Sequence, residues 1–580
     1  MATPQLLADG NLDYLVYDYL AEITMSILAR ARAKNPDLGY ATDFVRAAMA
    51  PNLHLIAAGG VKVIANAGGV NPQSCAAALR AVIRANELTL KVAVIEGDDL
   101  TMRAQALASS GIREMFSDCE FPPHERIASI NAYLGAFPIA AALAGGADIV
   151  ITGRCVDSAV TLGACIHEFG WRERDFDLLA AGSLAGHILE CGTQATGGNF
   201  TDWESIAVSM ADAGYPIAEV SANGSFVCTK PLSTGGLVSI GTVAEQMLYE
   251  IGDPRAYLLP DVTCDFSSVS MREIGRDRVA VAGARGSGPS PNFKASATFV
   301  DGFRGGEQWV VYGRDAEKKA RKIADTALAR ARRSLQAQHL PDFTETSVEI
   351  IGAETHYGAQ RVQREYREVQ LKVAARHLTH AGIATLFKEF VGTGLAAPPG
   401  LTAFAGGRPQ PSPVVRLFSF LVPKQEISIG VDVEGVKVAY VAAESPAPAP
   451  AMGGSPAWQE PQRPKPVGAL VSMPLERLAW GRSGDKGDKA NIGIIARKPE
   501  YLPYLWETLT AELVATRFAH FLKGGVDRFL LPGLPAINFV LHDVLGGGGT
   551  ASLRSDPQGK GFAQLLLAET IQVPRSLLES

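Results

Sequence analysis

Short apolar runs alternate with helical stripes along the first third of the chain. The runs at 62–65, 91–95 and 147–151 have the length of buried strands, and each leads into a glycine-containing turn. An apolar stripe at 12–27 predicts an opening helix that ends near Asn35. Strands that alternate with helices are typical of βαβ units. We therefore predict an α/β body with a largely parallel sheet, in which ligands bind beyond the carboxyl ends of the strands.

A proline-rich segment marks the clearest boundary in the chain. Residues 444–466 hold seven prolines in 23 positions, which excludes a regular helix or an inner strand there. The segment predicts an extended linker between an α/β body at 1–443 and a C-terminal domain at 467–580. The composition of the body changes where glycine-rich stretches begin and end. These changes suggest subdivisions near 180 and 310.

The C-terminal domain has a simpler order, with strand-like runs around one amphipathic helix at 502–522. The strand-like runs lie at 469–478, 491–496, 529–531, 536–544 and 562–573. This order predicts a small α+β sandwich. The charged segment at 481–490 contains three glycines and is interpreted as a loop between the first two strands.

Composition narrows the class of protein. Hydrophobic residues make up 47% and charged residues 20% of 580, which excludes a disordered chain. The net charge of −6 argues against non-specific binding of nucleic acid. The seven cysteines include no C-x-x-C pair, so we expect neither a disulfide framework nor a structural zinc site.

Membrane and targeting signals are weak. The longest apolar stretch, at 134–147, is too short to span a bilayer and is interrupted by glycine and proline. The first residues lack a basic region followed by an apolar run. We expect a soluble cytoplasmic protein that has no nucleic-acid or membrane partner and no metal site.

Two turns at strand ends carry candidate binding residues. Asn66, Gly68 and Gly69 lie between a strand and a helix, where glycine lets a ligand approach the main chain. A plain tight turn explains them equally well, and the G-x-G-x-x-G fingerprint of dinucleotide sites is missing. In the second turn, Arg154 suits a carboxylate or phosphate, whereas Asp157 either transfers protons or caps the next helix.

A third candidate segment spans 187–199. It places His187 and Glu190 beside a glycine-rich loop, and a buried carboxylic acid next to an imidazole is suited to acid–base chemistry. Cys191 offers a thiol, for which inert packing is the ordinary alternative. The binding residues predicted in the loop are Gly197, Gly198 and Asn199.

The most unusual stretch is the charged segment of the C-terminal domain. Its glycines let backbone N–H groups turn toward one point, and its cations suit phosphate or carboxylate. A solvated loop whose charges pair with one another is the alternative. The candidate anion-binding residues are Arg482, Ser483, Lys486 and Lys489.

Asp18 and Glu22 are four residues apart on the predicted first helix. Two adjacent carboxylates can raise one pKa. A solvated helix face is the more ordinary explanation of this spacing, so we leave both outside the predicted site.

Several long motifs resemble the acyclic terpene utilisation AtuA-like family. They are NAGGVNPQSCA, DIVITGRCVDSAV, GHILECGTQATGGNFTDW and RSGDKGDKANIGIIAR, and the resemblance runs from about residue 11 to the end. It implies that the C-terminal domain is ferredoxin-like. It also implies a place in the bacterial breakdown of terpenoid and branched acids as CoA thioesters, beside acyl-CoA carboxylases. It assigns no catalytic residue.

From the residues and this context we expect an enzyme that acts on an acyl-CoA thioester, most simply a hydratase or related lyase. Glu190 is the first candidate for moving the α-proton or activating water, followed by Asp157 and His187. Paired N–H groups at Gly68-Gly69 or Gly197-Gly198 are the candidates for an oxyanion hole. The cations named above are the candidates for holding the CoA phosphates, and we predict no cofactor beyond the CoA of the substrate.

Two alternatives remain open at this point. One is a non-catalytic subunit or scaffold that binds an acyl-CoA carboxylase, although glycine-rich loops at strand ends suggest a ligand pocket. The other is a thiol-dependent acyl transferase that uses Cys191 or Cys155. In each case we expect a homo-oligomer.

Overall fold

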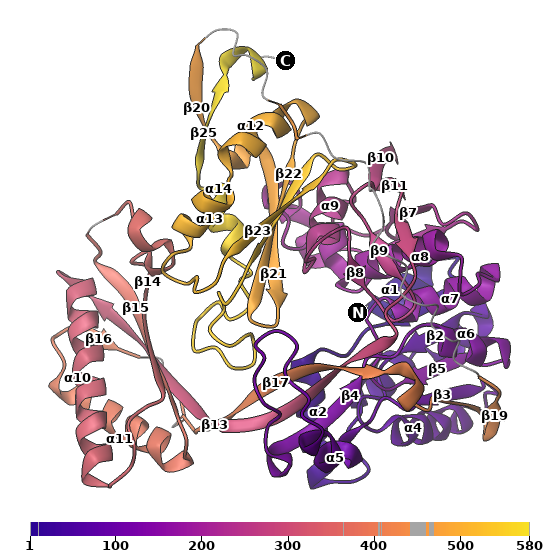
Figure 1. Cartoon of the computed structure of the whole chain (residues 1–580), viewed down its shortest axis with the longest axis horizontal. Helices are drawn as coiled ribbons and strands as arrows, with labels where there is room; N and C mark the ends of the chain where they lie inside the picture. The colour runs from indigo at the N-terminus through magenta and orange to yellow at the C-terminus, as the bar shows by residue number, and fades with distance from the viewer. Residues whose placement is uncertain are drawn as a thin grey trace.

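The computed structural model describes residues 2–9, 11–363, 365–403, 406–407, 409–440, 460–462 and 469–578. The predicted linker at 444–466 therefore lies outside the described residues, apart from 460–462. Figure 1 shows two broad parts at the base of the molecule and the C-terminal domain standing above and between them.

The first sheet is the part that the apolar runs predict best. Its strands in spatial order are β1 (Tyr14–Tyr17), β2 (Lys62–Ala65), β5 (Ile149–Thr152), β3 (Val92–Glu96), β18 (Gly430–Val433) and β19 (Val436–Val438). The first four are parallel, whereas β18 and β19 are antiparallel and come from the end of the body. Val63 and Ile64 point to opposite faces and are both fully buried, so this sheet is covered on both faces.

Seven helices accompany this sheet. They are α1 (Ala2–Asp9), α2 (Glu22–Lys34), α3 (Leu53–Gly59), α4 (Pro72–Ala85), α5 (Ala104–Ser109), α6 (Phe137–Ala144) and α7 (Ala159–Phe169). Helix α4 begins where Asn71 accepts a hydrogen bond from the backbone N–H of Ser74 and Pro72 occupies the first turn. The strand-to-helix turn that precedes α4 is therefore held in place at the carboxyl edge of the sheet.

Antiparallel strands follow in the glycine-rich stretch, together with α8 (Phe176–Leu189) and α9 (Ile240–Leu248). One sheet has the order β10 (Ser270–Gly275), β11 (Arg278–Ala282), β7 (Phe226–Thr229) and β6 (Ile217–Val220). A smaller one has the order β12 (Arg285–Ser287), β9 (Thr263–Asp265) and β8 (Tyr257–Leu258). Both pack into the same core as the helices α6 to α9.

One long strand, β13 (Asn292–Tyr312), connects the two lower parts of the molecule (Figure 1). Its first half pairs with β4 (Ile127–Ala132) and β17 (Ser412–Pro423). Its second half lies in a sheet with β14 (Glu345–Ile351), β15 (Glu368–His377) and β16 (Leu401–Thr402). Helices α10 (Ala316–Ala337) and α11 (His380–Ala396) pack on this second half and share a core with it.

The C-terminal domain contains a four-stranded antiparallel sheet. Its order is β21 (Ala479–Lys486), β22 (Lys489–Ala496), β24 (Ala536–Leu541) and β23 (Val526–Leu531). A two-stranded sheet joins β20 (Leu470–Pro474) to β25 (Thr570–Pro574), and the helices are α12 (Leu502–Thr508), α13 (Ala511–Arg517) and α14 (Phe562–Leu567). Antiparallel strands with helices are consistent with the predicted ferredoxin-like sandwich.

The prediction of a body with a largely parallel sheet is wrong. Parallel pairing is confined to β1, β2, β5 and β3 among the described strands, and the other sheets are antiparallel. The apolar runs identify strands correctly but do not say which strands pair. Sequence order also conceals the return of the chain through β18, which places an antiparallel edge on the parallel strands.

Several individual elements also differ from the prediction. The stripe at 12–27 is divided between β1 and α2, and the predicted loop at 481–490 is the hairpin of β21 and β22. The helix at 502–522 is divided into α12 and α13, and the run at 562–573 divides into α14 and β25. In the runs at 12–27 and 562–573, apolar spacing satisfies both periods over a few residues, and tertiary packing decides between them.

The C-terminal domain packs closely on the body. Helix α9 contacts both strands of the β21–β22 hairpin, and the Asn491 side chain donates to the carbonyl oxygen of Leu248 at 2.6 Å. Glycine makes this approach possible, because a Cβ at Gly484 would lie 2.4 Å from the ring of Tyr249. The hairpin tip is thereby held against the part of the body described next.

Candidate active site

Asp18 and Asn66 lie side by side because they follow the neighbouring parallel strands β1 and β2. The Asn66 amide donates to Asp18 Oδ1 at 2.5 Å and accepts from the backbone N–H of Tyr19 at 2.6 Å. Asn66 is fully buried. The predicted binding residue Asn66 therefore orients the Asp18 carboxyl group, which the sequence interpretation placed on a solvated helix.

Arg154 and Asp157 follow the next strand, β5. Arg154 is 4% exposed, its guanidinium lies 4.2 Å above the ring of Tyr133, and its Nη1 donates to Asp157 Oδ1 at 2.8 Å. The Arg154 backbone N–H donates to Asp98 at 2.8 Å. Burial raises the pKa of Asp98 to about 7. This end of the sheet thus collects acidic groups around one buried guanidinium.

Glu190 and His187 form a pair at the end of α8. His187 Nδ1 lies 3.0 Å from Glu190 Oε1, and His187 Nε2 lies 3.0 Å from the carbonyl oxygen of Met247. A carbonyl accepts only, so Nε2 carries a proton. Nδ1 is buried without a hydrogen bond among the described residues, so Glu190 acts on it through proximity and charge. Burial raises the pKa of Glu190, and the adjacent His187 opposes that rise.

The carboxyl groups of Asp18, Asp157 and Glu190 line one cavity of about 150 Å³. They come from three elements: the end of β1, the turn before α7 and the end of α8. The remaining lining is largely apolar, and it consists of Ala2, Thr3, Leu6, Leu15, Val16, Tyr17, Val160, Thr161, Gly186, Leu189, Gly192 and Tyr215. The cavity therefore offers an acid–base end and a hydrocarbon-binding wall.

Water reaches the acidic end of the cavity although protein surrounds it. Asp18 and Lys486 are each more than one-third exposed, and the Asp157 side chain is 39% exposed. Enclosure and the adjacent Asp157 raise the pKa of Asp18 to about 8. Enclosure also lowers the pKa of Lys486, with Lys294 as the next cause. Groups that are enclosed, wet and shifted in pKa are typical of ligand sites rather than of a sealed core.

Lys486 is the contribution of the C-terminal domain to this site. Its Nζ lies 4.8 Å from the ring centre of Tyr257 and 3.3 Å from the carbonyl oxygen of Glu250. Glu190 and Asp157 are the nearby carboxyl groups that act on its charge. The tip of the β21–β22 hairpin thus brings an ammonium group to the carboxyl groups of the body.

The other predicted residues of this hairpin lie elsewhere. Arg482 is 6% exposed, stacks at 4.6 Å on Tyr249 and donates to the carbonyl oxygen of Asn199 at 3.3 Å. Ser483 is buried and donates to the carbonyl oxygen of Gly559 at 2.7 Å. Lys489 lies 5.0 Å from the ring centre of Phe116. Arg482 and Asn199 therefore join the domains.

The four glycine N–H groups predicted for an oxyanion hole donate within the protein. Their acceptors are carbonyl oxygens: Thr152 for Gly68, Asn66 for Gly69, Gln194 for Gly197 and Thr193 for Gly198. These donors build turns, so a developing negative charge in the cavity needs another partner. Lys486 is the cation that the C-terminal domain brings near Glu190 and Asp157, next to the residues that line the cavity.

The cysteines considered as nucleophiles are not activated. Burial raises the pKa of Cys155 to about 12 and raises the pKa of Cys191 as well. A thiol is the unreactive form, so neither residue suits a thiol-dependent transferase at neutral pH.

The described residues contain neither a cluster of metal ligands nor a membrane-spanning helix. In these parts of the chain, no group of three or more His, Cys, Asp or Glu side chains is arranged to hold a metal ion. No helix among them is long and apolar enough to cross a membrane.

Sequence reasoning missed Asp18 and the role of Tyr257. The signal for Asp18 was present, since it directly follows a short apolar run as Asn66 does. Tyr257 lies in a two-residue strand with no pattern around it, so only the fold reveals its place beside Lys486 and His187.

The fold and the site define a two-part protein whose C-terminal α+β domain extends a hairpin to an acid–base cavity in the body. Residues 1–433 match the acyclic terpene utilisation family protein AtuA, and residues 473–572 match the AtuA ferredoxin-like domain. The chain belongs to this family, which indicates a role in terpene catabolism. No curated protein and no solved structure matches the chain.

Proposed function

We propose that the protein is a hydratase or related lyase that adds or removes water across a carbon–carbon double bond of an acyl-CoA thioester. The observation that supports this proposal is the single cavity that carries Asp18, Asp157 and Glu190 beside an apolar wall. A branched or terpenoid acyl chain is apolar and would lie against that wall. Family membership supports this choice of acyl group.

Hydration needs a base for the attacking water and an acid for the α-carbon. Glu190, in its pair with His187, takes the proton of the water whose oxygen bonds to the β-carbon. Asp18 is protonated at neutral pH because its pKa is raised to about 8, and it delivers a proton to the α-carbon. Asp157 is held by Arg154 and keeps the pKa of Asp18 high. Dehydration is the same path reversed.

The thioester oxygen gains negative charge while the α-carbon is an enolate. The predicted glycine donors are engaged in turns. We therefore assign this charge to the Lys486 ammonium group, which an enclosed site makes more effective than water would. The reaction needs no cofactor besides the CoA carried by the substrate.

The test is to incubate the full chain with a panel of branched enoyl-CoA thioesters and to follow the products by mass spectrometry. We expect a mass gain of one water. Glu190→Gln and Asp18→Asn should each lower kcat/KM by about 10²-fold or more. Asp13→Asn, at the exposed opposite end of β1, is the matched control and should leave kcat/KM unchanged. Unchanged mass for every thioester, or full activity of both cavity variants, would refute the proposal.

A further inference from the structure

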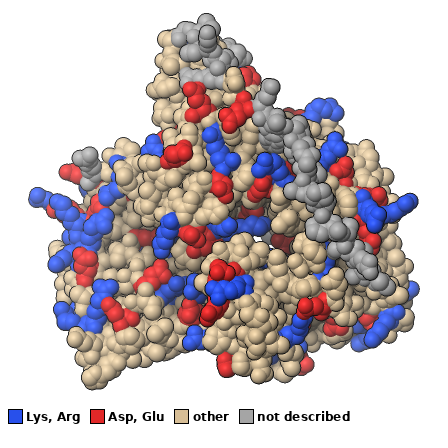
Figure 2. All heavy atoms as spheres, viewed as in Figure 1, with Lys and Arg blue, Asp and Glu red and all other residues tan. Residues whose placement is uncertain are grey.

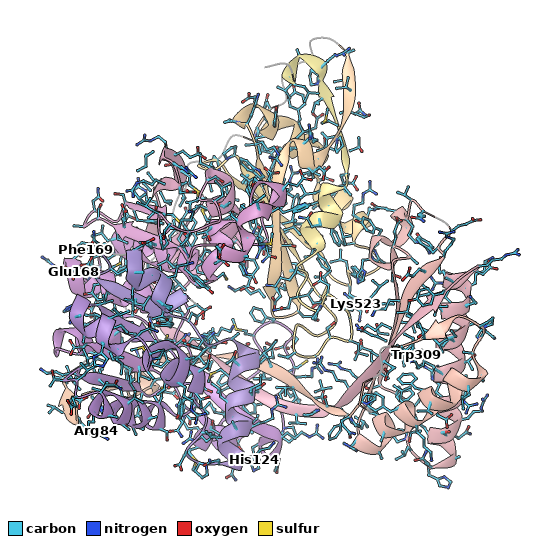
Figure 3. All side chains as sticks on the ribbon, turned by 180° about the vertical axis from the view of Figure 1, so that it is seen from behind. Arg84, His124, Glu168, Phe169, Trp309 and Lys523 are labelled. Atoms are coloured by element: carbon cyan, nitrogen blue, oxygen red, sulfur yellow. The ribbon has the colours of Figure 1, made fainter. Side chains whose placement is uncertain are left out.

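A second group of charged side chains lies away from the cavity, where the C-terminal domain meets the sheet of β13, β14 and β15. Arg304 is on β13, Arg376 is on β15, and Arg554 is in the segment before α14. Arg304 and Arg376 lie beside the glycine-rich segment 544–554, to which Arg554 belongs. Figures 1 and 3 show this segment of the C-terminal domain reaching toward the sheet, on which Trp309 is labelled in Figure 3.

Arg304 and Arg376 stand directly opposite each other on neighbouring antiparallel strands. Like charges in such positions destabilise a sheet. Glu345, opposite Arg376 on its other side, accepts from Arg376 Nη1 at 3.0 Å. Arg304 forms no ion pair within the described part of the chain, and burial together with Arg376 lowers its pKa. Glu345 thus pairs with Arg376 alone, and the adjacent Arg304 has no carboxylate partner among the described residues.

Arg376 also has N–H groups without a partner. Its side chain is 14% exposed, and its Nε and Nη2 atoms are buried with no acceptor among the described residues. A guanidinium group carries five N–H donors in a rigid plane. Leaving buried donors of a charged group unsatisfied is costly, which indicates that an acceptor belongs there.

The glycine-rich segment shapes the space beside these arginines. Gly546, Gly547 and Gly548 have φ values of +70°, +97° and +81°, which other residues rarely adopt. A Cβ at Gly547 would lie 3.7 Å from Arg376 Nη2, and one at Gly546 would lie 3.7 Å from Arg554 Cζ. The backbone therefore runs between two guanidinium groups, close enough for a Cβ to be in ordinary van der Waals contact with each.

The segment is held in this position from both sides. Arg304 Nη1 donates to the carbonyl oxygen of Ser552 at 3.0 Å, and Asp488 accepts from the backbone N–H of Gly547 at 2.9 Å. Glu349, the other nearby acid of the sheet, is engaged by Lys372 at 2.7 Å. Four carboxyl groups act on Arg554, namely Glu345, Glu349, Asp488 and Asp556. Each already accepts a hydrogen bond from another group, so the buried N–H groups of Arg376 keep no acceptor among the described residues.

We propose that Arg304, Arg376 and Arg554 with the segment 544–554 form a binding site for a phosphate group. A phosphate presents several acceptor oxygens and up to two negative charges, which suits guanidinium groups that converge from three elements. The group is either inorganic phosphate or a phosphate of a CoA ester. Only the second source rests on the function proposed above.

The test is calorimetric titration of the full chain, at low ionic strength and without phosphate in the buffer, with inorganic phosphate and separately with coenzyme A. We expect at least one probe to bind, and Arg304→Gln and Arg376→Gln to weaken binding at least tenfold. Arg304→Lys should retain part of the affinity. The matched control is Arg314→Gln, whose side chain is 97% exposed just after β13.

A second measurement separates loss of binding from loss of folding. Without ligand, Arg304→Gln removes both the like-charge contact with Arg376 and the hydrogen bond to Ser552, so its Tm should lie close to that of the wild type. Phosphate should raise the Tm of the wild type and of Arg314→Gln, and it should leave the Tm of Arg304→Gln unchanged. Binding of coenzyme A that depends on Arg304 identifies the CoA ester as the source, whereas binding of phosphate alone identifies the free ion. Absence of binding by both probes, or equal binding by every variant, overturns the proposal whatever the thioester assays show.

Discussion

Asp18 and Lys486 owe their chemistry to where the fold places them. Asp18 follows β1, where the Asn66 amide fixes its carboxyl group and Asp157 faces it. Lys486 is at the tip of a hairpin some 470 residues further along the chain. Both are enclosed by protein and reached by water. Neither spacing nor composition contains this information, because it depends on two distant segments meeting.

Asp18 predicts a specific dependence of stability on pH. Its folded-state pKa is about 8 against an ordinary value of 3.8. Between these values the unfolded chain ionises Asp18 and the folded chain does not, so wild-type stability falls as the pH rises toward 8. Asp18→Asn should remove this loss. We expect the Tm of the variant to match that of the wild type at pH 4 and to exceed it increasingly up to pH 8. Water in the cavity solvates the ionised carboxylate and so reduces this difference in Tm.

Thermal melts across this pH range, with Asp13→Asn as the control, measure the effect. Asn retains the carbonyl oxygen that accepts from Asn66, so the variant keeps the local hydrogen bond. A Tm difference that stays constant with pH would show that Asp18 titrates normally, and would remove it as the acid.

Lys486 predicts a loss of rate rather than of binding. Lys486→Met should lower kcat on the thioester by about 10²-fold with a smaller change in KM, because the charge matters most in the enolate-like transition state. Lys486→Arg should retain part of the rate. Lys523→Met, exposed in the same domain and labelled in Figure 3, is the control. A raised KM with unchanged kcat would assign Lys486 to substrate binding instead.

At the scale of elements, sequence patterns identify strands and helices with a sustained period. The strand at 62–65 follows from its apolar run alone. The β21–β22 hairpin does not, because its charged residues and glycines are typical of a loop. In the structure, glycine at 484 and 493 is what allows those strands to contact helix α9. A glycine that allows two elements to approach closely cannot be distinguished in a sequence from a glycine that makes a loop flexible.

The hairpin predicts an unequal response to two glycine substitutions. A Cβ at Gly493 would lie 2.7 Å from Leu248 Cβ, so Gly493→Ala should force β22 away from α9 and cost about 1–3 kcal/mol. It should also lower activity, because Lys486 moves with the strand. Gly525→Ala, where a Cβ meets nothing within 4 Å, should do neither. Denaturant unfolding and the thioester assay decide this, and equal effects of both variants would contradict close packing as the cause.

At the scale of the whole molecule, the site is assembled from segments that the sequence keeps apart. The proline-rich segment suggested separable domains, and the family matches also fall into two ranges. The fold nevertheless joins them through α9, the hairpin and the segment 544–554. The fold class was predicted incorrectly for the same reason, since β13 and the return of β18 connect distant parts. Figure 2 shows charges of both signs interspersed over one face, so surface charge does not reveal the joint either.

One ion pair between the C-terminal domain and the body allows us to test whether the site depends on the docking of the two. Arg497 contacts both carboxylate oxygens of Asp202 across the domains, at 2.6 and 2.5 Å, and Trp480 donates to the same group at 2.8 Å. Asp202→Asn should weaken docking by about 1 kcal/mol, a modest value because the carboxylate is 38% exposed. We expect faster hydrogen exchange in α9 and the hairpin, and reduced thioester turnover.

The pH dependence of the same contact has the opposite sign to that of Asp18. The hydrogen bond from Arg497 lowers the pKa of Asp202 below 3.8, so its contribution is present at neutral pH and is lost as the pH falls through that lowered value. Asp527→Asn, which removes an exposed pair with His542 inside the C-terminal domain, is the control. If Asp202→Asn increases exchange in the hairpin yet leaves turnover intact, then Lys486 does not act from the C-terminal domain. If the variant instead loses both its protection from hydrogen exchange and its turnover of thioester, then docking of the C-terminal domain completes the site.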